Sequence, residues 1–399
     1  MPGIERDLGT VIGVSEVERA EYAFTQVERW LRSEPMVELL GMFADGDGGE
    51  MVGWLHLNEE LPGWLDGLFQ DAEGIDGPFQ GAEGITAQGE LLRHVLVVER
   101  AAAGAFNFRT PDGSSYRERS QAVSADFDDA TRERIARLAD ELGLVEAREP
   151  RFRAYDKTLV LGGGYRSPLL RTKYAALLRE RGTQLGEVSF LGSPRFLIED
   201  AARPERPVAE RYAPGATDEF GLMLGAARAE LGLRASGIEF LCGCTSDSEP
   251  CPKWPYREAE NADRTPAEFT HERRAPLTNE TGEMVGSVLS ACTSRPPYRP
   301  DTSDTLGLWA RCAEPRAGQR VLLVTTQVFV PFQQFDALRR IYLPYGAEVE
   351  TVGFGPEWGD RPQNAEYLLQ ETLSAIRSAR RLLVAAAKVL APGALGSTG

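Results

Sequence analysis

Short apolar runs alternate with amphipathic stretches through the second half of the chain. Apolar residues recur at helical spacing after the first run, at Leu170, Tyr174 and Leu178. Strands that alternate with helices favour crossover connections and a mainly parallel sheet. The pattern therefore predicts an α/β fold. The predicted strands lie at 158–161, 188–191, 238–242, 285–290, 321–326 and 348–353.

The first 150 residues follow a different pattern. Ser15 and Glu18 form a capping box at the start of one predicted helix. Residues 128–142 have acidic residues at their start and a glycine just past their end, which predicts a second helix. Residues 90–100 are strongly apolar, and their periodicity does not decide between strand and helix. We therefore predict a smaller, mostly helical or α+β N-terminal region.

A charged segment with a proline, 146–152, marks the predicted domain boundary. Residues 1–150 would form an accessory or lid region, and residues 151–391 the α/β domain, with a polar insertion at about 244–281. Residues 392–399 are small and are predicted to be a flexible tail. The segments FQDAEGI and FQGAEGI, within 69–85, indicate a tandem duplication in an exposed loop, since a repeat array needs more copies.

Composition narrows the possible partners. The 399 residues carry a net charge of −16, and a surface this acidic repels phosphate backbones and anionic lipid headgroups. We therefore expect neither a nucleic acid nor a membrane as partner. No apolar run reaches about 18 residues, and the first residues lack the pattern of a signal peptide. Five cysteines, an odd number, favour reduced thiols, so a cytoplasmic protein is predicted.

A glycine turn follows the first predicted strand. Gly162, Gly163 and Gly164 precede Ser167 and Pro168, a preferred N-cap and a preferred first helical residue. The N–H groups and the dipole of a helix start favour an anion. The sequence therefore predicts an anion or phosphate site here, while a tight turn without a ligand is the alternative.

Arginines near the ends of the predicted strands could supply positive charge to this site. Arg166 and Arg171 flank the glycine turn, Arg195 follows the second strand, and Arg299 precedes a later helix. The alternative is that they are surface arginines paired with the many carboxylates of this acidic chain. Ser193 and Arg195 end the second strand, where a dinucleotide site would place a carboxylate, so a nicotinamide dinucleotide is disfavoured.

Other candidates lie at the same predicted edge of the sheet. Glu219 begins a helix, where it compensates the dipole or acts as a general base or hydroxyl contact. Thr302 opens another helix, and capping explains it fully unless its hydroxyl binds a phosphate. Thr325, Thr326 and Gln327 end the strand at 321–326 and could contact a ligand.

Three cysteines and a histidine lie in or beside the predicted insertion. Cys242, Cys244 and Cys251 form a C-x-C-x6-C pattern, with His271 further on. Structural zinc sites favour paired C-x2–4-C units, so the spacing favours buried thiols without a metal, at least for Cys242. No histidine lies close in sequence to activate a thiolate. We therefore predict no metal site.

The ordered motifs of the second half resemble those of the bacterial YdcF/SanA/ElyC-like family. LVLGGG at 159–164 is similar to the family's opening strand and glycine turn, and Thr217-Asp218-Glu219 to its acidic helix start. RPDTSDT at 299–305 looks like its Arg-x-Asn-Thr signature. VLLVTTQVFVPFQQFDALR at 321–339 looks like its late strand with a Thr-rich end.

The resemblance covers about residues 155–385 and has two departures. Asp301 stands where the family usually has Asn, and no histidine follows 324–327, where many members have one. The resemblance implies a Rossmann-like three-layer α/β domain with a pocket above its sheet. It also implies a nucleotide-like ligand, with S-adenosylmethionine as a possible cofactor.

Together, these features predict an enzyme that binds a nucleotide-like or phosphorylated small molecule and catalyses group transfer or hydrolysis. The glycine turn would hold the anion, with Arg171, Arg195 and Arg299 as counter-charges and Glu219 as acid/base or hydroxyl contact. The second hypothesis is a metabolite-binding or interaction protein without turnover. The third is an S-adenosylmethionine-dependent methyltransferase, against which Arg195 at the end of the second strand counts.

Overall fold

The computed structural model describes the chain in segments that form two compact units. The first unit comprises Met1–Val145, Pro331–Gly346 and Pro362–Gly399, and the second Glu146–Val330 and Ala347–Arg361. The two continuous regions predicted from the sequence, 1–150 and 151–391, differ from this division, because two late segments contact the N-terminal helices. The described residues are 14–43, 80–81, 84–85, 87–108, 124–195, 197, 205–245, 251–253, 271–294, 300–359 and 363–390.

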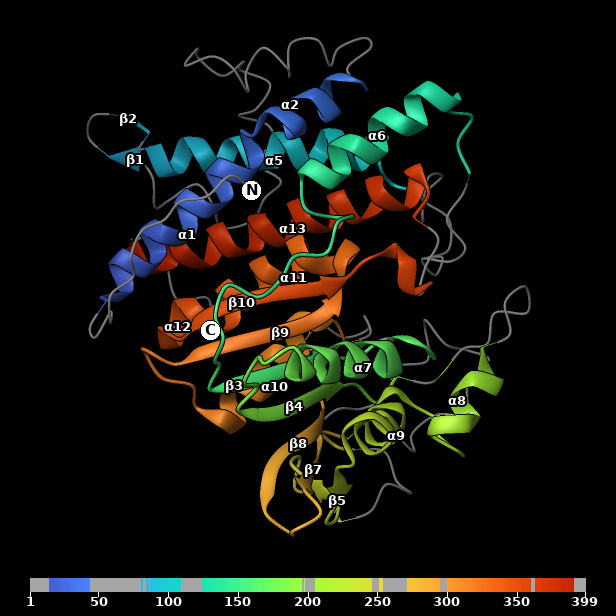
Figure 1. Cartoon of the computed structure of the whole chain (residues 1–399). Coiled ribbons are helices and arrows are strands. Elements are labelled where there is room, and N and C mark those ends of the chain that lie inside the picture. Colours follow the sequence, from blue (N-terminus) through green and yellow to red (C-terminus); the bar gives the residue numbers. More distant parts are fainter. Residues whose placement is uncertain are drawn as a thin grey trace. The chain divides into compact units, whose positions relative to one another are not determined.

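The second unit contains an eight-stranded sheet in the order β10-β9-β3-β4-β8-β7-β5, with β6 paired to β7 (Figure 1). Five neighbouring strands are parallel, and the three strands at one end pair antiparallel, so the predicted mainly parallel sheet is confirmed. The parallel strands are β3 (Lys157–Leu161), β4 (Glu187–Gly192), β8 (Met284–Ser290), β9 (Arg320–Thr326) and β10 (Glu348–Phe354). The antiparallel strands are β5 (Arg234–Ala235), β6 (Glu239–Phe240) and β7 (Arg273–Thr278).

Helices cover both faces of this sheet. The chain moves in one direction along the sheet from β3 through β4 to β8, and then returns past β3 to β9 and β10. Because crossovers are right-handed, this reversal puts α7 and α9 on one face and α10 on the other. The result is a three-layer Rossmann-like α/β fold. Its helices are α7 (Ser167–Glu180), α8 (Arg206–Tyr212), α9 (Glu219–Leu231) and α10 (Thr302–Ala313), with short 3-10 turns η3 (Gln327–Phe329) and η5 (Pro356–Trp358).

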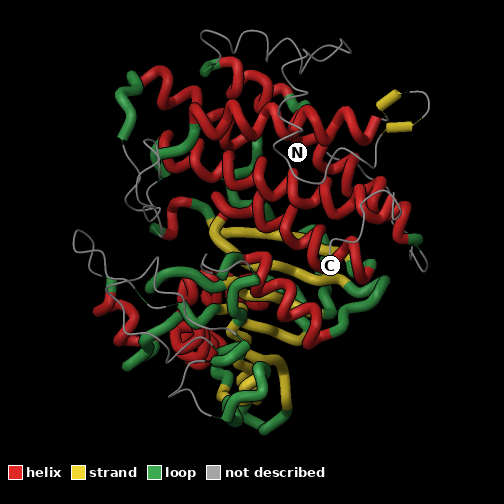
Figure 2. The backbone as a smooth tube through the Cα atoms, turned by 180° about the vertical axis from the view of Figure 1, so that it is seen from behind, coloured by secondary structure: helices red, strands yellow, loops and turns green. Residues whose placement is uncertain are grey.

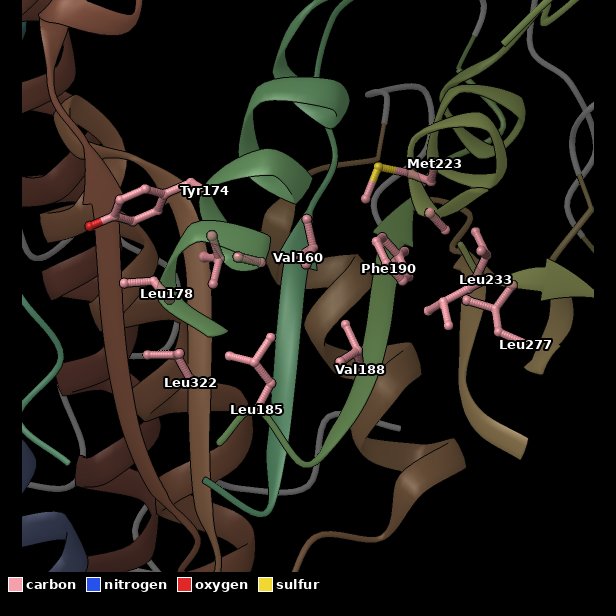
Figure 3. Close-up of a cluster of buried hydrophobic side chains, with 14 of the residues drawn as sticks. Val160, Tyr174, Leu178, Leu185, Val188, Phe190, Met223, Leu233, Leu277 and Leu322 are labelled. Atoms are coloured by element: carbon pink, nitrogen blue, oxygen red, sulfur yellow. The ribbon is translucent and has the colours of Figure 1, made fainter. Parts of the chain in front are cut away.

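A continuous apolar core lies between the sheet and the helices α7 and α9. Val160 and Phe190 come from the central strands, and Tyr174 and Leu178 from α7 (Figure 3). Met223 of α9 points into the same cluster. This packing holds α7 and α9 against the sheet, which fixes where both helices begin.

The sequence prediction fails in the segment after α9. Residues 238–242 were expected to form a parallel strand, but only Glu239–Phe240 pairs, and it pairs antiparallel with β7. The third parallel strand is β8. β7 itself lies inside the predicted polar insertion, because its Arg273 is held by an ion pair and its Ala275 and Leu277 are buried. Residues 246–250 and 254–270 of that insertion lie outside the described residues, as does the predicted tail.

The first unit is mainly helical, as the N-terminal pattern predicts (Figure 2). The long α13 contacts α1, α5 and α6, and the undecided stretch 90–100 lies within helix α5. None of the helices in the described segments is long and apolar enough to cross a membrane. The elements are α1 (Glu16–Leu31), α2 (Glu34–Gly41), β1 (Gln80–Gly81), β2 (Gly84–Ile85), α5 (Ala87–Ala105), α6 (Asp129–Glu141), α11 (Val330–Ala337), the π-helix η4 (Leu338–Tyr342), α12 (Leu343–Tyr345) and α13 (Ala365–Leu390).

A buried carboxylate links α13 to α6. Glu366 accepts hydrogen bonds from Arg132 at 3.1 Å and from the backbone N–H of Ala125 at 2.9 Å. Burial opposes its ionisation, but these hydrogen bonds outweigh burial and lower the pKa of Glu366. Because the folded-state pKa is lowered, this contribution to stability is present above the ordinary pKa of a glutamate and is lost as the pH falls through the folded value.

We therefore expect Glu366→Gln to unfold at a lower temperature than the unmodified chain at pH 7. The difference between their midpoints should shrink as the pH falls below about 4.3, the ordinary glutamate pKa. Circular dichroism melts between pH 3 and 7 measure this. Glu28→Gln is the control, because Glu28 forms an exposed ion pair with Arg32 and should change the midpoint little. A pH-independent difference for Glu366→Gln would contradict the assignment.

Candidate active site at the carboxyl ends of the strands

The parallel strands end at one edge of the sheet, and the loops that follow them carry most of the predicted site residues. The registers run in step, with Gly192 opposite Ser290 and Phe354 opposite Thr326. Ligands bind outside the carboxyl ends of such strands, where the strand order reverses. In this sheet the reversal lies between β3 and β9.

Arg171 fills the place between the ends of β3 and β9. Its Nη1 donates to the carbonyl oxygen of Leu161 at 3.0 Å and to that of Gly162. Its Nε and Nη2 both lie 3.4 Å from Thr326 Oγ1, and its guanidinium lies 5.4 Å from the centre of the Phe329 ring. Arg171 is only 2% exposed. It was predicted to be a counter-charge for a ligand, and in the structure it is buried in contact with the ends of two strands.

Gly162 and Gly163 permit close approach within the site. The N–H of Gly162 donates to Leu191 O at 2.6 Å, and a Cβ added at Gly162 would lie 2.5 Å from that oxygen. A Cβ added at Gly163 would lie 2.8 Å from the Cβ of Ser167. Glycine is therefore required by the tight fit between the turn, β4 and α7. The amide of Gly162, predicted to face an anion, is instead part of the sheet.

Glu219 lies beside the ends of β3 and β4. Its Oε2 accepts a hydrogen bond from Ser193 Oγ at 2.8 Å, and its Oε1 lies 3.5 Å from Arg195 Nη1. A Cβ added at Gly162 would lie 3.5 Å from Oε2, which places the carboxylate against the glycine turn. The structure thus brings together Gly162, Ser193, Arg195 and Glu219, all predicted site residues. Arg195 keeps 24% of its side chain exposed.

A buried ion pair fixes the start of α9 and hence Glu219. Asp218 caps the helix by accepting the N–H of Gly221 at 2.8 Å, and Arg273 of β7 donates to its other oxygen. Arg273 also lies 3.3 Å from Ser290 Oγ, and 4.3 Å from the centre of the Phe220 ring. Sequence reasoning missed this contact because Arg273 lies in the predicted insertion, and no local pattern pairs it with Asp218.

A second set of contacts orders the loop between the glycine turn and α7. Arg166 Nε lies 3.5 Å from Glu205 Oε1. Tyr212 donates its hydroxyl proton to Tyr165 O at 2.7 Å, and burial together with the nearby Glu205 raises the pKa of Tyr212. The hydroxyl therefore stays protonated and holds the loop. Arg166 is thus partly neutralised, which weakens its predicted role as a counter-charge.

The start of α10 follows the capping pattern. Asp301 accepts the N–H of Asp304 at 3.1 Å, and Asp304 in turn accepts the N–H of Asp301 at 3.0 Å. Ser294, after β8, donates its hydroxyl to Asp304 at 2.5 Å. Thr302 lies in the first turn and is half-buried. Capping accounts for this group without a ligand.

The remaining predicted site residues differ in burial. Gly164, in the turn before α7, and Arg166 are half-buried, and Arg299 lies outside the described residues. Buried positions are Ser167, Thr325, Thr326 and Gln327.

A groove of about 490 Å³ lies at the opposite edge of the sheet. It is lined by the end of α7 and the start of β4, including Arg179, Gln184 and Val188. It contains none of the predicted site residues, and parallel sheets bind ligands at the other edge. The chemistry of the site therefore does not coincide with this groove.

Cys242, Cys244, Cys251 and His271 come together, and their potential ligand atoms all lie within 4.8 Å of one another. Cys242 Sγ lies 3.4 Å from His271 Nδ1. His271 lies 29 positions from Cys242 in the sequence, but the fold places it beside that thiol, where no histidine close in sequence was available. The start of β7 carries His271 back to the loop after β6, through the antiparallel pairing of these two strands.

Comparison with known proteins gives relatives but no function. Proteins described as uncharacterized, from Mycobacterium bovis and two strains of Mycobacterium tuberculosis, are 34% identical to this chain over 258 residues. The matched region is 63% of this chain and 66% of each relative, slightly less than two thirds of their length. No protein-family model matches the chain, and no solved structure matches it either.

Proposed function

We propose that the second unit binds a nucleotide-like or phosphorylated small molecule at the carboxyl ends of β3 and β4, and catalyses its hydrolysis or group transfer. The observation that carries the proposal is the position of Glu219. Nucleotide-binding sheets place a carboxylate near the end of the second parallel strand, where it accepts a hydrogen bond from a ribose hydroxyl. In this chain β4 ends without a carboxylate, and Glu219 of α9 lies at that place, next to Ser193.

The charges of the site support an anionic ligand. Arg195 is partly exposed and lies next to Glu219, so a hydroxyl and a phosphate of one ligand could be bound side by side. Helix α7 begins just after the glycine turn, and the positive end of its dipole favours an anion nearby. The net charge of −16 supports a small ligand over a nucleic acid, because such a surface repels an extended phosphate backbone.

Within this proposal Glu219 has two possible roles. A carboxylate that accepts a substrate hydroxyl can also remove its proton, which activates the oxygen for transfer. Alternatively, Glu219 only binds the ligand, since its two oxygens are already engaged by Ser193 and Arg195. This second reading supports a metabolite-binding protein without turnover. The ribose of S-adenosylmethionine could donate a hydroxyl hydrogen bond to the same carboxylate, so methyl transfer is the third candidate.

We expect Glu219→Gln to weaken binding of a ribose-bearing anion, such as an adenine nucleotide, by roughly 10- to 100-fold, the value of a charge-assisted hydrogen bond. The same substitution should not weaken the binding of inorganic phosphate, because it removes a negative charge from beside Arg195. Arg195→Met should weaken the binding of the ribose-bearing anion and of inorganic phosphate. Isothermal titration calorimetry with nucleotides, sugar phosphates, S-adenosylmethionine and phosphate measures these affinities.

Glu187→Gln is the matched control, since it is the same change at the opposite end of β4, where Glu187 pairs with Lys157 at 2.6 Å. It should leave every affinity unchanged. If none of the ligands binds, or if Glu187→Gln weakens binding as much as Glu219→Gln, the proposed site is wrong. Turnover of a bound ligand distinguishes the enzyme from the metabolite-binding protein.

A further inference from the structure

Three separate segments of the second unit bring four metal-binding side chains to one point. Cys242 and Cys244 lie just after β6, Cys251 follows in the next described segment, and His271 lies just before β7. Cys251 and His271 are buried, and Cys242 and Cys244 are half-buried. No other group of side chains in the described segments gathers three or more such ligand atoms.

The spacing of these atoms fits a tetrahedral metal ion. Cys244 Sγ lies 3.6 Å from Cys251 Sγ, and Cys242 Sγ lies 3.4 Å from His271 Nδ1. Two sulfurs bound to one zinc ion at about 2.3 Å each stand about 3.8 Å apart, and a sulfur and a nitrogen about 3.5 Å apart. All four atoms lie within 4.8 Å of one another, so one ion can contact them all.

We propose that Cys242, Cys244, Cys251 and His271 bind one structural zinc ion. Thiolates and an imidazole in tetrahedral arrangement select zinc among the common divalent metals. Four protein ligands close the coordination shell, so no position is left for a substrate or an activated water. On binding, the three thiols release their protons to solvent, and the histidine coordinates as the neutral ring.

The ion would replace the apolar core that this part of the fold lacks. β5 and β6 each have two residues, and most of the residues from β5 to the loop after β6 are half-buried or exposed. A metal that joins residues 242 and 271 closes this segment onto the start of β7. Two residues later, Arg273 holds Asp218 and Ser290. The zinc ion would therefore fix the end of β7 from which this buried contact extends.

The competing chemistry is a disulfide between Cys244 and Cys251, whose sulfurs are neighbours. Oxidation would remove two of the four ligands and leave Cys242 beside His271 as a reactive thiol. The two states differ in thiol count and in metal content. The zinc site does not depend on the proposed ligand site, since its ligands share no residue with it.

The test is the metal content of the purified full chain and its response to Zn²⁺ alone. We expect one zinc per chain by elemental analysis, and a lower melting temperature after chelation that zinc restores. Re-addition of Co²⁺ to the stripped chain should produce visible absorption bands of tetrahedral cobalt and a thiolate charge-transfer band. In the zinc-bound chain, the three ligand thiols should react slowly with a thiol reagent, and chelation should make them reactive.

His271→Ala should lose the zinc, whereas His271→Cys should keep it, because Nδ1 and a cysteine sulfur hold a metal at similar distances from the Cβ. Cys312→Ser is the control, since Cys312 is exposed on α10 and lies outside the cluster. A stripped chain that takes up no zinc would overturn the proposal. So would a Cys244–Cys251 disulfide in the purified chain, iron in place of zinc, or full zinc content in His271→Ala.

Discussion

Arg273→Met is expected to lower the free energy of unfolding by about 3–5 kcal/mol, because it leaves the Asp218 carboxylate buried without its cation. Both side chains of this ion pair are almost fully buried, with 6% and 4% exposed. Each kcal/mol corresponds to a fall in melting temperature of about 2–4 °C for a unit of this size. Denaturant and thermal unfolding measure the change.

The cause of this loss can be separated from a general effect of replacing an arginine. Arg234→Met, on the exposed strand β5, should change stability by no more than about 0.5 kcal/mol. Adding Asp218→Asn to Arg273→Met should recover part of the loss, since a neutral amide is less costly to bury than an unpaired carboxylate. Equal stability of Arg273→Met and Arg234→Met would show that the buried pair is energetically unimportant.

Arg171→Met is expected to destabilise the second unit by about 2–4 kcal/mol. It removes the donor for the carbonyl oxygens of Leu161 and Gly162, and an unsatisfied buried acceptor costs about 1–3 kcal/mol. The stability of Arg171→Lys should fall between those of the unmodified chain and Arg171→Met, because a single ammonium group cannot reproduce the planar set of donors that reaches both strands. Urea unfolding followed by circular dichroism measures the difference.

Arg179→Met serves as the comparison, because Arg179 is exposed on the same helix and should have little effect. The outcome also decides between two roles for Arg171. If Arg171→Met is as stable as the unmodified chain but no longer binds an anion, then Arg171 is the ligand contact that the sequence predicts. A loss of stability supports the contact between β3 and β9 instead.

Local patterns predicted the elements that have strong local signals. The stretches at 321–326 and 348–353 became β9 and β10 with nearly the same bounds. The first begins with an apolar run typical of a buried parallel strand, and the second, at the edge of the sheet, alternates glutamates with valines. Helix α9 ends at Gly232, whose φ of 71° suits glycine. Its N-cap is Asp218, within the Thr217-Asp218-Glu219 stretch that resembles a helix start in the sequence.

The candidate site was predicted in part for the same reason. Gly162, Ser193 and Arg195 follow predicted parallel strands, whose carboxyl ends meet at one edge. Glu219 lies at a helix start, where dipole compensation was an equal explanation. Only the packing of α9 against β4 puts its carboxylate next to Ser193.

The sequence by itself determined the alternating α/β pattern, the parallel sheet and the loops in which a site can form, because these depend on residues close together in the chain. The tertiary structure decided what each side chain does. It placed Arg171 against the ends of β3 and β9, paired Arg273 with Asp218, and brought His271 to Cys242. Such contacts join residues far apart in sequence, and the strand pairing that creates them leaves no local pattern to read.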